Sequence, residues 1–66
     1  MSVRVCYWAL GRGELLRLDL ETVPARGDVV TLQEIGLIGR VVQRDFATAD
    51  DGVEELLIQL ELNSPA

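Results

Sequence analysis

The sequence predicts an all-β fold: a five-stranded antiparallel small barrel. Two observations lead to this class. Apolar residues recur at alternate positions in several short stretches, and glycine, proline or aspartate separates these stretches. The 66 residues suffice for one domain only. We expect strands at about residues 2–10, 14–22, 28–33, 38–47 and 53–62, forming one domain over residues 1–62 with a frayed tail at 63–66.

The first two strands are predicted to form a hairpin around Gly11-Arg12-Gly13. The strand at 2–10 carries large apolar groups on both faces, so Trp8 and Leu10 are candidates for contact with another surface. The strand at 14–22 alternates leucines with charged residues, and the charged row discourages edge-to-edge aggregation. Pro24 cannot donate a ladder hydrogen bond and therefore ends this second strand.

The stretch from Val23 to Ala47 is predicted to turn the corner of the barrel. Gly27-Asp28 opens a short strand, and Gly39-Arg40-Val41 opens a longer one. This pattern resembles the Gly-Asp and later Gly-x-Val of KOW-type and other SH3-like small barrels, over about a quarter of the chain. The resemblance implies the fold more than the function. KOW domains often bind RNA, ribosomal or transcription partners through basic loops, whereas the loops here carry Glu34, Asp50 and Asp51.

The second half of the chain contains one predicted irregularity and one ambiguity. Apolar residues from Arg40 to Ala47 do not alternate cleanly, which predicts a β-bulge near Gln43. Asp51-Gly52 predicts a type I′ hairpin turn. Residues 53–62 fit a strand better than a helix, although Asp51 and Glu54 could form a capping box. A helix there would give an α+β fold, and an OB-like sheet is the other alternative.

The alternation also predicts which side chains fill the interior. Twelve side chains are expected to point inward: Val3, Val5, Tyr7, Leu16, Leu18, Leu20, Val29, Val42, Phe46, Leu56, Ile58 and Leu60. Four large side chains are then left over: Trp8, Leu10, Leu37 and Leu57. Exposing all four would forgo about 1.5 to 3 kcal/mol each relative to burial. We therefore expect a contact with another chain to cover them.

The residue types argue against catalysis. Histidine is absent and Cys6 is the only cysteine, which leaves no ordinary zinc ligand set and no disulfide. Cys6 has no visible partner that would lower its pKa. The acidic residues Asp50, Asp51, Glu54 and Glu55 lack the spacing of a calcium loop and are expected to form a solvated hairpin tip. We expect no enzyme activity, no metal and no cofactor.

The charge makes nucleic acid and membrane surfaces unfavourable partners. The net charge is −5, from eleven acidic residues and six arginines, so phosphates and anionic lipid repel the chain. No apolar run reaches the ~20 residues of a membrane span. Arg40 and Arg44, joined by Arg4, could grip a phosphate or a carboxylate, but cross-sheet pairing with Asp19, Glu21 or Glu61 explains them more simply. The unpaired thiol predicts a cytoplasmic location.

The resulting functional hypothesis is a non-catalytic protein–protein interaction module. It would act as a homo-oligomer or as the small subunit of a larger assembly, encoded by a phage or another mobile element. The predicted contact residues are Trp8, Leu10, Leu37, Leu57, Arg40 and Arg44. The alternatives are a KOW-type nucleic-acid-associated barrel, with Arg4, Arg40 and Arg44 as its basic stripe, and an acidic inhibitor that mimics nucleic acid.

Overall fold

A computed structural model describes residues 2–62, and the tail expected at 63–66 lies outside this range. Five strands make up one sheet: β1 (Val3–Ala9), β2 (Gly13–Leu20), β3 (Val29–Leu32), β4 (Leu37–Thr48) and β5 (Glu54–Leu62). The described residues include no helix. All five predicted strands are therefore confirmed to within two residues, and 53–62 is a strand, which removes the α+β alternative.

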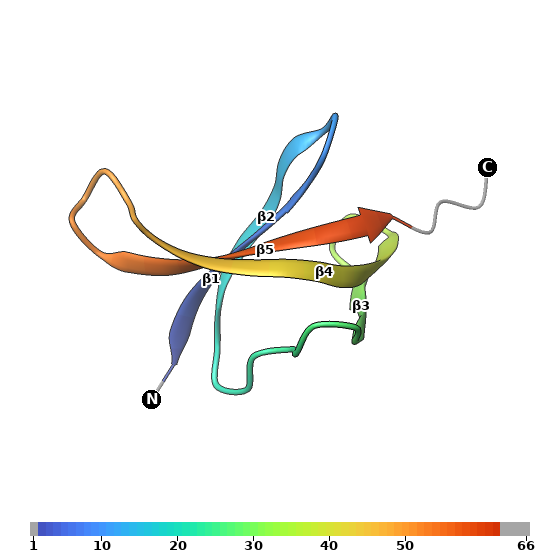
Figure 1. Ribbon diagram of the computed structural model, residues 1–66, viewed down its shortest axis with the longest axis horizontal. Helices are drawn as coiled ribbons and strands as arrows, with labels where there is room; N and C mark the ends of the chain where they lie inside the picture. Colours follow the sequence, from blue (N-terminus) through green and yellow to red (C-terminus); the bar gives the residue numbers. More distant parts are fainter. Residues whose placement is uncertain (1, 63–66) are drawn as a thin grey trace.

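The strands follow the order β2-β1-β5-β4-β3 in a mixed sheet that curls into a half-barrel (Figure 1). The prediction of an antiparallel sheet is only partly right, because β1 and β5 pair in parallel. The other three pairs, β1–β2, β3–β4 and β4–β5, are antiparallel, as short connections require. No turn links β1 to β5, so chain connectivity leaves their relative direction free.

The core lies on the concave face of the sheet, called here the inner face. Its buried apolar residues come from four strands: Val5, Tyr7, Leu32, Val41, Leu56, Ile58 and Leu60. The leucines of β2 and Val23 of the following loop are partly buried against this cluster. Of the side chains expected inside, Val29 is 61% exposed, because Val30 and Leu32 are the residues of β3 that face the core.

The predicted bulge lies in β4 between Val41 and Gln43. Val41 is opposite Leu60, Gln43 is opposite Gln59, and Val42 is the extra residue. Because of this insertion, Val41 rather than Val42 enters the core. The bulge also re-aims the rest of the strand, which positions the candidate site described below.

Glycines shape the corners of the half-barrel. Gly27 has a φ of 93°, and its N–H donates to the carbonyl of Val41, whose own N–H donates to the carbonyl of Asp28. These two bonds continue the β3–β4 ladder by one step. Gly39 lies where a Cβ would be 3.0 Å from Cβ of Leu60 and 3.2 Å from the carbonyl oxygen of Glu61. A side chain at this position would require its neighbours to shift by a few tenths of an ångström, so Gly39 favours the close approach of β4 and β5.

The β4–β5 turn differs from the predicted type I′ geometry. The N–H of Gly52 donates to the carbonyl of Ala49, and Gly52 has a φ of 81°. No described residue other than glycine has a positive φ, so Asp51 does not take the conformation that a type I′ turn requires. The loop is instead a turn that ends in a left-handed glycine, with the Val53 N–H bonded to Asp51 Oδ1.

Candidate functional site

The structure does not gather the four leftover apolar side chains into one patch. Trp8 and Leu57 are half-buried on the outer, convex face, where β1 and β5 are neighbours. Leu10 follows β1 and is 80% exposed. Leu37 is half-buried at the other side of the sheet, where it pairs with Leu32 on the inner face. Trp8, Leu10 and Leu57 could therefore contribute to one contact, and Leu37 lies apart from them.

Arg40 and Arg44 lie on opposite faces of β4. Arg40 is opposite Glu61, whose neighbours Leu60 and Leu62 face inward, so Arg40 faces outward. Arg44 is opposite Ile58, a buried core residue, and therefore faces inward. The two arginines are four positions apart on one strand, yet they do not share a face because the bulge lies between them. Arg4 does not join them, since its Nη1 bonds to Asp51 Oδ2 at 2.9 Å.

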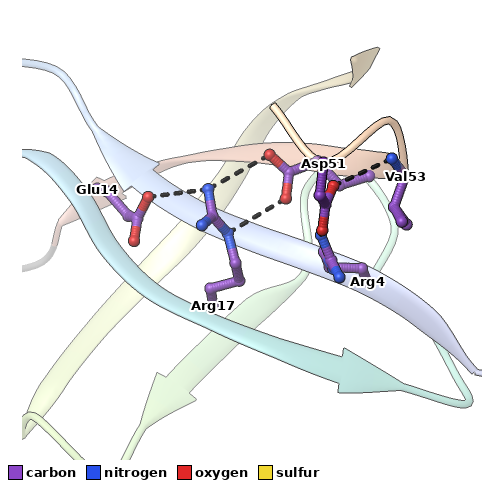
Figure 2. Close-up of polar contacts among 6 residues, drawn as sticks. Arg4, Glu14, Arg17, Asp51 and Val53 are labelled. Carbon is purple, nitrogen blue, oxygen red and sulfur yellow. Dashed lines mark hydrogen bonds and ion pairs between the residues drawn. The ribbon is translucent and has the colours of Figure 1, made fainter. Parts of the chain in front are cut away.

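An ionic network covers the outer face where β2, β1 and β5 meet (Figure 2). Arg17 on β2 lies between two carboxylates: its Nη2 is 3.1 Å from Glu14 Oε1, and its Nε is 3.2 Å from Glu55 Oε2. Arg4 on β1 reaches Asp51 in the β4–β5 turn. The network connects β1, β2 and β5 with the β4–β5 turn. These four elements come from distant positions in the sequence.

Burial and charge set the properties of this network. Glu55 is only 5% exposed, so the acidic cluster is not wholly the solvated tip that the sequence predicts. Hydrogen bonds from Arg4 and from the Val53 N–H hold the pKa of Asp51 below its ordinary value. Burial, with Glu14 nearby, raises the pKa of the Cys6 thiol. A thiol of raised pKa is a poor nucleophile at neutral pH.

The chemistry of this network is that of a structural contact. The depression of about 390 Å³ between Arg4, Arg17 and the turn at 48–51 already has its arginines bonded to carboxylates. Within residues 2–62, no group of three His, Cys, Asp or Glu side chains is arranged to hold a metal ion. The candidate site therefore lies elsewhere on the sheet.

The free edge of β4 is the feature that sequence reasoning missed. β3 pairs with β4 only over Leu37–Arg40, and the Gly27-Asp28 bonds extend this ladder to Val41. Beyond Val41, the turn at 25–28 directs the β2–β3 loop away from β4. Residues 43–48 thus have β5 as their strand neighbour on one side and, among the described residues, no strand on the other (Figure 1).

An apolar pocket opens on the inner face beside this free edge. Phe46 is opposite Leu56 and faces inward as predicted, yet it is 69% exposed because no strand of the described chain covers this end of the half-barrel. The pocket has a volume of about 220 Å³, and its lining residues are Val3, Val23, Arg44, Phe46 and Leu56. Arg44 donates from Nη1 to the carbonyl of Pro24 at 3.2 Å, which holds the β2–β3 loop as the opposite wall.

A polar depression adjoins the pocket along the same edge. It has a volume of about 470 Å³, and its lining residues are Arg26, Val42, Gln43, Arg44 and Asp45. Neither Arg26 nor Arg44 lies within 4.0 Å of a carboxylate in the described part of the chain. Arg44 lines both hollows, so they adjoin each other along the edge of β4, and the two together are called here the β4-edge site.

One signal in the sequence could have revealed the β4-edge site. The predicted strand at 28–33 is shorter than its neighbour at 38–47, so part of the longer strand had to lack a partner on that side. Phe46 falls in that unpartnered half. Its inward direction follows from alternation alone, which gives the face of a side chain but not what covers that face.

No family model, curated protein or solved structure matches this chain. Nor does any helix among the described residues have the length and apolar character needed to cross a membrane.

Proposed function

We propose that this protein is a non-catalytic protein–protein interaction module that works as a homo-oligomer or as the small subunit of a larger assembly. The observation that supports it most is the β4-edge site, where an exposed aromatic ring adjoins a strand edge that no other strand covers within residues 2–62. Sheet edges of this kind are the usual template for pairing with another chain. Natural domains protect such edges unless they use them.

The energetics favour a covered Phe46. Burying a phenylalanine side chain is worth about 1.5 to 3 kcal/mol, a large fraction of the stability of so small a domain. Phe46 forgoes most of this contribution in the isolated chain, since it is 69% exposed. Arg44 and Asp45 beside it reduce non-specific aggregation, because charged residues at an edge disfavour indiscriminate pairing. The arrangement suits selective pairing with a partner.

The residues predicted from the sequence remain part of the proposal. Trp8, Leu10 and Leu57 would form a second contact area on the outer face and at the end of β1, and Leu37 and Arg40 would belong to the rim of an assembly. Arg44 belongs to the β4-edge site. The finer assignment of the fold, an SH3-like barrel, is also part of the proposal. Its support is the Gly27-Asp28 corner bonded to Val41.

A cytoplasmic location and an origin in a phage or another mobile element complete the proposal. The location is supported by the free, buried Cys6. The origin is supported only by small size and the residue types of the sequence.

The test is solution mass by light scattering over a dilution series, combined with cross-linking and capture from the source cell. Three serine variants are compared with the native chain: Phe46→Ser in the β4-edge site, Trp8→Ser on the outer face, and the matched control Val29→Ser, which replaces another exposed apolar residue on β3. We expect Phe46→Ser to lose the complex and Val29→Ser to keep it. A native chain that stays a 7.3 kDa monomer and captures nothing would refute the proposal.

A further inference from the structure

The two hollows of the β4-edge site fit one occupant, and this inference rests on the proposed function. We propose that β4 accepts an extended segment of another protein as an added strand. This segment carries a carboxylate and a large apolar side chain two residues apart. The added strand would lie along residues 43–48, with its apolar side chain in the pocket beside Phe46 and its carboxylate against Arg44 and Arg26.

The spacing of two follows from the geometry of a strand. Arg44 and Phe46 both face inward because they are opposite Ile58 and Leu56. On an added strand, the residues directly opposite them also lie two apart on the same face. The residue between them would be opposite Asp45 on the outer face, where a basic side chain is favourable.

Charge complementarity identifies the polar member of the pair. The guanidinium of Arg44 has five N–H donors, and its one hydrogen bond within the described chain goes to the neutral carbonyl of Pro24. Arg26 lines the same depression and is likewise not bonded to a carboxylate there. The carboxylate in this lining, Asp45, faces outward and accepts a hydrogen bond from Gln43 Nε2 at 2.9 Å. Because the chain as a whole carries −5, a segment with one carboxylate at this position and basic residues around it is the best match.

The free strand edges within residues 2–62 do not offer the required pattern, so we infer that the occupant is not a second copy. On β2, Leu16, Leu18 and Leu20 share the inner face, and the charged residues Arg17 and Asp19 lie on the other. Strand β3, at the other edge of the sheet, contains no carboxylate. Pairing of β4 with itself would offer Arg44 only the inward-facing members of residues 43–48, and none of these is a carboxylate.

The probe is a synthetic heptapeptide, Thr-Glu-Lys-Leu-Lys-Glu-Thr, which presents the pattern in both chain directions and carries no net side-chain charge. Titration into the full chain is followed by NMR. We expect amide shifts concentrated at residues 43–48, about tenfold weaker binding for Phe46→Ser, and about threefold weaker binding for Arg44→Gln. The matched control Val29→Ser should bind as the native chain does. Replacing both glutamates of the peptide by glutamine should remove the effect of Arg44→Gln.

The outcomes separate this inference from the proposed function. If the peptide does not bind while the chain still forms a complex that Phe46→Ser abolishes, the strand pattern is wrong and the interaction module stands. If Phe46→Ser instead converts a dimer of the native chain to a monomer, the occupant is a second copy and the inference is overturned. If neither peptide nor cellular partner binds, both fail.

Discussion

Arg17 on β2 lies with Nε 3.2 Å from Oε2 of Glu55 on β5, across the intervening strand β1. The carboxylate is nearly buried, with a side-chain exposure of 6%, whereas the arginine side chain is 45% exposed. The arginine side chain therefore covers the Glu55 carboxylate and neutralises its charge, which folding has removed from water. A buried carboxylate without its cation is strongly unfavourable.

Removing the cation of Arg17 should therefore destabilise the fold more than removing the exposed carboxylate of Glu14, its other partner. We expect Arg17→Met to lower the Tm by several degrees, and Glu14→Gln, which removes the solvent-exposed carboxylate, to lower it much less. The double variant Arg17→Met/Glu55→Leu should recover part of the loss because no buried charge remains. Thermal melts of the four proteins test this, and equal melting of Arg17→Met and Glu14→Gln would show that Glu55 does not need its cation.

The Asp51 contact should make stability depend on pH in the acid range. Arg4 and the Val53 N–H hold the pKa of Asp51 in the folded chain below the ordinary value of 3.8. Because the folded pKa is the lower one, the stabilisation is fully present above pH 3.8 and is lost as the pH falls through the folded pKa. The difference in Tm between the native chain and Asp51→Asn should therefore be constant near neutrality and shrink on acidification.

The neighbouring carboxylate provides the control for this titration. Asp50 takes part in no side-chain hydrogen bond or ion pair within residues 2–62. Asp50→Asn should therefore melt like the native chain at each pH. A gap for Asp51→Asn that widens on acidification would contradict the assignment.

Truncation of two apolar residues on the inner face should destabilise the fold to very different extents. Ile58 is fully buried, so Ile58→Ala should cost about 2 to 5 kcal/mol and unfold much of the population. Phe46→Ala removes more atoms than Ile58→Ala does. It should nevertheless lower the free energy of unfolding by less than about 1 kcal/mol, because the ring is 69% exposed. Urea denaturation measures both free energies. A large loss for Phe46→Ala would mean that the ring serves folding and not binding.

Nucleic-acid binding should be weak or absent. The arginines that could have formed a basic stripe are separated, since Arg40 and Arg44 face opposite sides of β4 and Arg4 is bonded to Asp51. The net charge of −5 adds a long-range repulsion. A shift assay at about 50 mM salt gives phosphate contacts their best chance. Tight binding there that fades with added salt would favour the KOW-type alternative.

The sequence by itself determined the local structure of this protein. Alternation of apolar residues in several stretches, together with the glycine, proline or aspartate between the stretches, located the five strands. Gly27, Gly39 and Gly52 marked the places where the chain turns or where strands approach closely. The irregular pattern around Gln43 also revealed the bulge. These features depend on neighbouring residues and on the intrinsic freedom of glycine, so a short stretch of sequence contains the information.

Only the tertiary structure decided which strands meet and which surfaces stay open. The parallel pairing of β1 with β5 joins the two ends of the chain, and no local signal specifies its direction. The bulge separates Arg40 from Arg44 only once the register with β5 is fixed. Phe46 is exposed because β3 pairs only with the first four residues of β4. Its exposure thus depends on how far a different segment of the chain extends. Alternation predicts the direction of a side chain, whereas its burial depends on what the rest of the chain places over it.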